Sequence, residues 1–167
     1  MAWERLAHFA LSTAGDTIDT ADDTSFSGDN FTAKQSMRVL VHIQDSGTCN
    51  VKMRFNGFSD QSYSTKYGES GANDGSPSTS ATFIRCYEVG SGTDVQRQMT
   101  FEITNISDKE KHILGHTVES ESTGASSIPK RVELAGKFDK TNQQITRIQL
   151  VNDASGSFGA GSYITVL

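Results

Sequence analysis

Apolar and polar residues alternate along most of this chain, a pattern typical of β-strands that turn one face towards a core. The clearest example spans residues 37–43, where every second side chain is apolar: Met37, Val39, Val41 and Ile43. The same alternation resumes at 49–55 after the Gly-containing connection 45–48. We therefore predict that residues 37–56 form a β-hairpin.

Further short strands are expected along the rest of the chain, separated by turns rich in Gly, Asn, Asp and Ser. Their predicted ranges are 3–11, 63–67, 81–89, 99–106, 113–118, 132–138, 145–151 and 163–167. In 113–118 apolar residues fall at odd and even positions, so we expect both faces of that strand to be covered. The Ser-, Thr- and Glu-rich segment 119–129 is expected to form a long exposed loop that contains Glu119.

About eight to ten short strands with no helical periodicity predict an all-β fold, an antiparallel β-sandwich. We favour a jelly-roll-like version because two packed sheets of this kind accommodate that many strands with loops of uneven length. The alternative is an immunoglobulin-like sandwich. It is disfavoured by the strand count and by the lack of a Cys, Trp, Cys arrangement.

Length and charge narrow the classes of partner. At 167 residues the chain is expected to form a single domain, 1–167. The formal net charge is -5 and no basic cluster occurs, so we expect no nucleic-acid partner. Neither a signal layout nor an apolar run of about 20 residues is found, so we expect no secretion and no membrane insertion. The two cysteines, Cys49 and Cys86, are interpreted as small reduced core residues.

The sequence contains no motif that would indicate an enzyme, a cofactor site or a metal site. It lacks a Gly-X-Ser-X-Gly elbow and a phosphate-binding Gly-Lys pair. His112 and His116 would lie about 13 Å apart along a strand, too far to share a metal ion. Five carboxylates lie between Asp16 and Asp29, but their spacing does not match a calcium loop. We therefore predict no catalytic residue, no cofactor and no metal.

A binding site is the strongest chemical hypothesis. Tyr63 and Tyr67 would share one face of a strand, with Arg54, Asn56 and Asp74 close by in the sequence. Such a mixture can stack on a sugar ring and hydrogen-bond to its hydroxyl groups. The favoured interpretation nevertheless places both tyrosines in the core with their hydroxyl groups at its rim.

Several short motifs, taken in order, point to a family. They are Trp3-Glu4, Phe31-Thr32-Ala33-Lys34, Arg54-Phe55-Asn56-Gly57, Tyr63, Lys66-Tyr67, Gly71-Ala72-Asn73-Asp74-Gly75, Asn105, Lys109-Glu110-Lys111, Gly115-His116, Gly136-Lys137-Phe138, Gln144-Ile145 and Gly156-Ser157-Phe158-Gly159-Ala160-Gly161-Ser162. In this order they resemble small virion structural proteins of tailed bacteriophages from marine and freshwater habitats. The resemblance implies an all-β structural protein of the particle without enzymatic activity, and it transfers no binding residues.

Two roles follow from that resemblance. The first is a capsid decoration or cement protein, a homotrimer at the virion surface that braces the major capsid protein or other virion proteins after synthesis in the host cytoplasm. The acidic charge and the lack of a fibrous repeat favour it. The alternative is a head-fibre or tail-fibre tip that recognises a host glycan through residues 63–74. The absence of a coiled-coil shaft in this sequence counts against that alternative.

Overall fold

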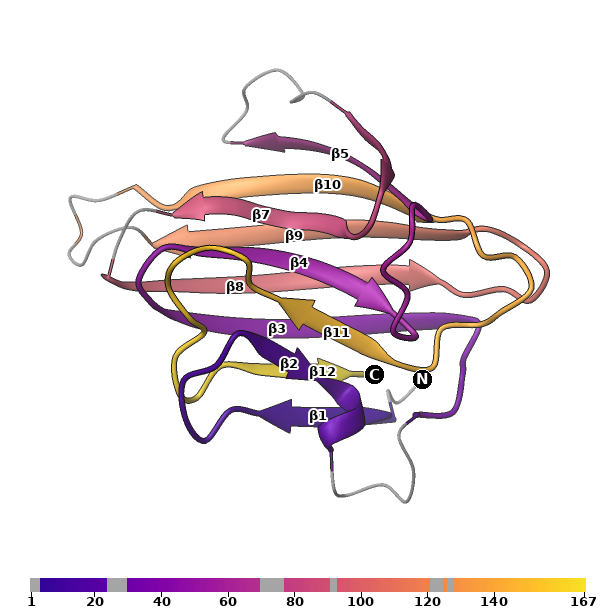
Figure 1. The fold of residues 1–167 in the computed structure, drawn as a ribbon, viewed down its shortest axis with the longest axis horizontal. Coiled ribbons are helices and arrows are strands. Elements are labelled where there is room, and N and C mark those ends of the chain that lie inside the picture. Colours follow the sequence, from indigo (N-terminus) through magenta and orange to yellow (C-terminus); the bar gives the residue numbers. More distant parts are fainter. Residues whose placement is uncertain (1–3, 24–29, 70–76, 91–92, 121–124, 126–127) are drawn as a thin grey trace.

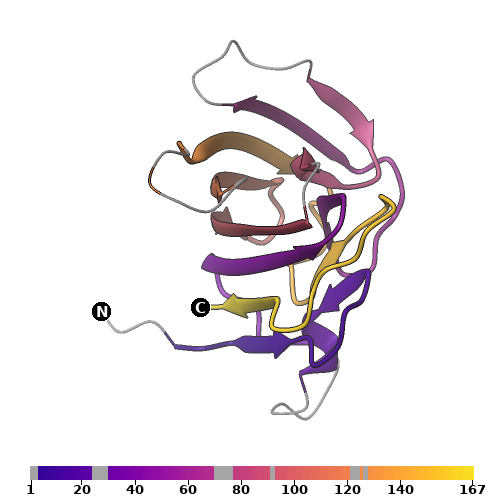
Figure 2. The same ribbon diagram turned by 90° about the vertical axis from the view of Figure 1, so that its left-hand side faces the viewer.

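A computed structural model describes residues 4–23, 30–69, 77–90, 93–120, 125 and 128–167. Two antiparallel sheets pack face to face (Figure 1), and Figure 2 shows the two layers from the side. This arrangement confirms the predicted all-β sandwich. The strands within the described ranges agree with the alternating pattern of the sequence, because buried and exposed side chains take turns along them.

The larger sheet has eight strands. In spatial order they are β1 (Ala7–Ala10), β12 (Tyr163–Val166), β3 (Ser36–Ser46), β8 (Thr93–Thr104), β9 (Lys111–Ser120), β10 (Lys130–Phe138), β5 (Tyr63–Glu69) and β6 (Ser78–Ala81). The smaller sheet has four strands, which are β2 (Thr17–Asp19), β11 (Ile148–Val151), β4 (Cys49–Phe55) and β7 (Ile84–Gly90). A single turn of 3₁₀ helix, η1 (Thr20–Asp22), follows β2.

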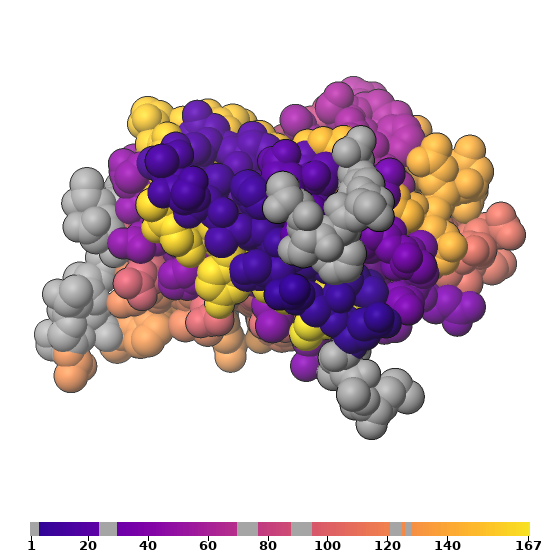
Figure 3. All heavy atoms as spheres, turned by 90° about the horizontal axis from the view of Figure 1, so that it is seen from below, coloured from indigo at the N-terminus to yellow at the C-terminus, as the bar shows by residue number. Residues whose placement is uncertain are grey.

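The strand order is that of a jelly roll. Strands β1 to β4 pair antiparallel with β12, β11, β8 and β7 respectively, so the chain behaves as one long hairpin that has been rolled into two layers. The two halves of the chain therefore lie side by side: Figure 3 shows the indigo N-terminal segment against the yellow C-terminal one. Strands β5, β6, β9 and β10 are insertions, and all four extend the larger sheet beyond β8.

The predicted hairpin over 37–56 is wrong. Strand β3 pairs with β12 and β8 in the larger sheet, whereas β4 pairs with β11 and β7 in the smaller one. The connection between β3 and β4 crosses from one sheet to the other at Gly47, whose φ of 138° favours glycine. Alternation shows which side chains are buried, but a hairpin and a crossing between sheets bury the same ones.

The predicted strand 81–89 also changes sheet. Its first residue, Ala81, ends β6 in the larger sheet, and β7 in the smaller sheet begins at Ile84. The break between them lets the chain pass from one layer to the other. This crossing closes the insertion that began after β4.

The larger sheet packs against the smaller one with one face and exposes its other face to solvent. We call this side the outer face, formed by the side chains of His8, Arg38, Leu40, His42, Gln44, Ser64, Lys66, Gln96, Gln98, Thr100, Glu102, Thr104, His112, Leu114, His116, Val118, Arg131, Glu133, Ala135, Lys137, Tyr163 and Thr165. Leu114 is 59% exposed and Val118 is 52% exposed. The expectation that both faces of this strand are covered is therefore wrong.

A charged cluster lies inside the sandwich. Arg97 on β8 is fully buried and bonds to Asp45 on β3 and to Glu119 on β9, the latter at 3.3 Å between Nη2 and Oε1. Its guanidinium also stacks over the ring of Tyr87, 4.3 Å from the ring centre. Burial raises the pKa of Asp45, although Arg97 opposes the shift. Glu119 thus belongs to a core strand and not to the predicted exposed loop.

We expect Arg97→Met to destabilise the fold by about 3–5 kcal/mol, because two buried carboxylates would lose their cation. The free energy of unfolding, from urea denaturation at pH 7, measures this effect. The matched control is the triple variant Arg97→Met, Asp45→Leu, Glu119→Met, which removes the charges together. It should recover most of the loss, and a triple variant as unstable as Arg97→Met would contradict this account of the cluster.

Candidate functional site

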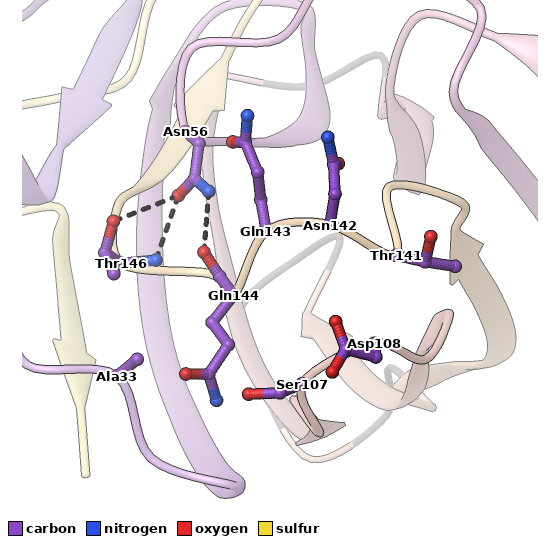
Figure 4. Close-up of a pocket in the computed structure, with 9 residues that line it drawn as sticks. All are labelled: Ala33, Asn56, Ser107, Asp108, Thr141, Asn142, Gln143, Gln144 and Thr146. Atoms are coloured by element: carbon purple, nitrogen blue, oxygen red, sulfur yellow. Dashed lines mark hydrogen bonds between the residues drawn. The ribbon is translucent and has the colours of Figure 1, made fainter.

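A polar pocket of about 410 Å³ lies at one end of the sandwich, where the segment before β3 meets the loops after β4, β8 and β10 (Figure 4). We call it the amide pocket. It is lined by Ala33, Asn56, Ser107, Asp108, Thr141, Asn142, Gln143, Gln144 and Thr146. Most of these side chains are amides or hydroxyls, and one is a carboxylate.

Asn56 builds one wall of the pocket. It follows β4 with a φ of 52°, a left-handed conformation that asparagine tolerates better than most residues. Its Nδ2 donates to the carbonyl of Gln144 (2.8 Å), and its Oδ1 accepts from the backbone N–H groups of Thr146 (2.9 Å) and Arg147 (3.1 Å) (Figure 4 shows the first two). The side chain is therefore used to hold the neighbouring loop.

Asn105 holds the same loop from the side of the core. This fully buried residue donates from Nδ2 to the carbonyls of Lys34 and Ile145, both at 3.0 Å, and its Oδ1 accepts from the N–H of Ile145 (2.7 Å). Asn56 and Asn105 thus form hydrogen bonds with backbone groups of this loop that would pair with a neighbouring strand if the loop were part of a sheet. Residues 145–147 therefore run outside the sheet. The predicted strand 145–151 accordingly begins only at Ile148.

Other side chains around the pocket remain available. Ser107, Thr141, Asn142 and Gln143 make no side-chain hydrogen bond to another residue of the described ranges. Figure 4 shows Asn142 and Gln143 projecting side by side to one side of their loop, whereas Ser107 and Asp108 lie on its other side. Such neutral donors and acceptors suit a ligand with many hydroxyl groups, and the described residues of the lining include no aromatic ring to stack on it.

Tyr63 does not reach this pocket, and it is not a surface for stacking. It is 2% exposed, and its ring stacks on Phe138 with the ring centres 5.0 Å apart. Its hydroxyl accepts from the N–H of Phe55 (2.9 Å) and donates to the carbonyl of Phe58 (3.1 Å). Burial raises the pKa of Tyr63 to about 12. The core interpretation of this tyrosine is confirmed.

The other predicted contact residues are scattered. Tyr67 is half-buried against the core, with the guanidinium of Arg85 5.4 Å from its ring centre. Arg54 donates from Nε to the carbonyl of Thr82 at 3.2 Å. Asp74 lies outside the described residues. Of the described members of the predicted set, Asn56 alone lines the amide pocket.

The sequence did contain a signal for the pocket. Three consecutive amides, Asn142, Gln143 and Gln144, follow the turn after β10. Polar residues in such a place are ordinary for a loop, so the run alone did not indicate a site. Only the fold places them around one pocket together with Ser107 and Asp108.

The acidic segment near the N-terminus has a structural role in its described part. Arg147 binds the carboxylate of Asp19 through Nε, at 3.0 and 3.1 Å, and through Nη2. Within the described ranges, no three His, Cys, Asp or Glu residues gather in a way that could hold a metal ion. The same ranges contain no helix of the length and apolarity needed to cross a membrane.

Neither the models of known protein families nor the curated protein sequences gave a match to this chain. The class of molecule is defined by its fold, a jelly-roll sandwich. The larger sheet has one broad uncovered face, and a polar pocket lies at one end of the sandwich. Its function has to be argued from these features.

We expect Asn105→Ala to lower the free energy of unfolding by about 2–4 kcal/mol, because buried carbonyl and N–H groups would lose their partner. Asn142→Ala is the matched control. The same change at an exposed side chain without a hydrogen bond should cost no more than about 0.5 kcal/mol. Urea denaturation of both variants tests the assignment, and equal losses would show that Asn105 does not hold the loop.

Proposed function

We propose that this chain is a structural protein of a tailed-bacteriophage particle, and that it decorates the capsid. The observation that supports this most is the complete jelly-roll order combined with an eight-stranded sheet whose outer face is uncovered. Jelly rolls occur in viral capsid proteins as well as in lectins. The ordered sequence motifs that resemble phage virion proteins support the same proposal.

A decoration protein stabilises a particle by binding to it selectively. Binding to the assembled lattice of the major capsid protein, and not to free subunits, shifts the equilibrium towards intact capsids. In a trimer, three modest contacts act together because the second and third become intramolecular once the first has formed. This role needs a stable fold and a contact surface, and it does not need catalysis.

Particles that lack this protein are expected to assemble but to release their DNA at a lower temperature than wild-type particles. Thermal release of DNA, followed with a fluorescent dye, measures the difference. Adding the purified chain back should restore the wild-type temperature. Unchanged heat stability combined with failure to adsorb to the host would replace the decoration role with the fibre-tip role.

The amide pocket supports the second candidate, recognition of a host glycan by a head-fibre or tail-fibre tip. Its largely neutral lining offers donors and acceptors suited to sugar hydroxyl groups. The pocket thereby replaces the originally predicted contact region, in which Tyr63 is buried. Without an aromatic ring in its lining, binding would rest on hydrogen bonds alone.

If the pocket binds a glycan, the double variant Asn142→Ala, Gln143→Ala should bind purified host surface polysaccharide at least about tenfold more weakly, through loss of hydrogen bonds. Gln61→Ala, an exposed amide outside the pocket, is the control and should bind like the wild type. Isothermal titration calorimetry provides the affinities. Absence of heat with the wild-type chain would count against the glycan role.

A further inference from the structure

The outer face differs in charge from the rest of the chain. Its described side chains include four cations and two carboxylates, which gives +2: Arg38, Lys66, Arg131, Lys137, Glu102 and Glu133. The whole chain carries -5, and five of its acidic residues have side chains outside the described part of the structure, so the other described side chains carry -2. Among the described side chains, the outer face is therefore the more positive part.

All four histidines of the chain also lie on the outer face. His8 and His42 flank Tyr163, with ring centres 5.7 and 5.5 Å from it, and His112 and His116 are exposed on β9. Histidine is neutral or cationic but never anionic near neutral pH. None of the four therefore offsets the positive charge of the face.

The centre of this face is apolar. Leu114 and Val118 are both more than half exposed on β9, and the cross-strand partner of Leu114 on β10 is Ala135. A shallow hollow of about 330 Å³ lies beside Leu114, between β9, β10 and Lys66 on β5. An apolar centre with a charged and polar rim is the usual anatomy of a protein–protein interface.

We infer that the outer face docks onto an acidic protein surface that presents an apolar side chain to the hollow beside Leu114. This inference deepens the proposed function. It rests on that function in one respect, namely that the acidic surface belongs to the capsid lattice. Opposite charge favours such a partner, because complementary potentials guide and orient association.

Three other occupants fit the face less well. Two copies joined through the same face would bring together two surfaces of net +2, so a symmetric dimer is disfavoured. A nucleic acid or an anionic membrane would need a denser set of cations. Here Glu102 and Glu133 lie among the four basic residues of the face. The phosphate backbone of a nucleic acid also offers no apolar contact to Leu114 and Val118.

The test adds the purified chain to particles that lack it and measures binding by sedimentation. Leu114→Ser and Lys66→Glu should each weaken binding about tenfold or more, and added salt should weaken binding of the wild type. The controls are Ile106→Ser, at a residue 47% exposed outside the face, and Lys109→Glu in the turn after β8. Both should stay within about twofold of the wild type.

The outcomes separate the two proposals. If the wild type binds and the face variants bind equally well, the docking face is wrong and the decoration role stands. If the wild type does not bind particles, the decoration role fails. Retention of the purified chain on immobilised poly-L-glutamate then tests the docking face separately. Retention that Lys66→Glu reduces and Lys109→Glu does not reduce supports the face, whereas absent or equal retention overturns it.

Two further measurements address the other occupants. Tighter binding to duplex DNA or to phosphatidylglycerol vesicles than to poly-L-glutamate would overturn the inference of a protein partner. A concentration-dependent mass in gel filtration that Leu114→Ser abolishes would show that a second copy occupies the face, which also overturns it.

Discussion

The pairing of β1 with β12 joins the two ends of the described chain, and the rest of the jelly roll is nested inside it. Each of the pairs β2–β11, β3–β8 and β4–β7 brings together segments that are far apart in sequence. Bringing such segments together costs loop-closure entropy before any contact compensates for it. The nested order limits that cost, because each pair that forms shortens the loop that the next pair must close.

The two insertions explain why the sheets differ in width. Strands β9 and β10 extend the larger sheet past β8, and they pass over the core with glycine at two inward positions. A Cβ at Gly115 would lie 2.6 Å from Phe101, and a Cβ at Gly136 would lie 2.9 Å from Ile84. Large side chains of the core thus occupy the space of the missing ones. The inserted strands pack closely on their inner side and leave a wide outer side in solvent.

The sequence alone was sufficient for most of the strands and most of the core, because alternation reports burial directly, but it did not predict β6, and β8 begins at Thr93, before the predicted residue 99. It was not sufficient to predict that β3 and β4 belong to different sheets, because a hairpin and a crossing between sheets would both bury Val41 and Val51. Glu119 was misplaced because an acidic residue at a strand end resembles a loop residue, and Arg97, distant in sequence, supplies the cation that its burial requires. The amide pocket was missed for a similar reason: its walls come from four segments that are far apart in sequence.

Side chains on the outer face are free of most constraints that the fold imposes. Gln98 and Thr100 occupy the same kind of position on β8 as Val118 and His116 do on β9, and they are their cross-strand partners. Strand β9 would therefore form equally well with polar residues in place of Leu114 and Val118, and the exposed apolar area would be smaller. Folding does not require these two side chains at the surface. Their place beside the cations and histidines is better explained by contact with a partner than by stability of the chain itself.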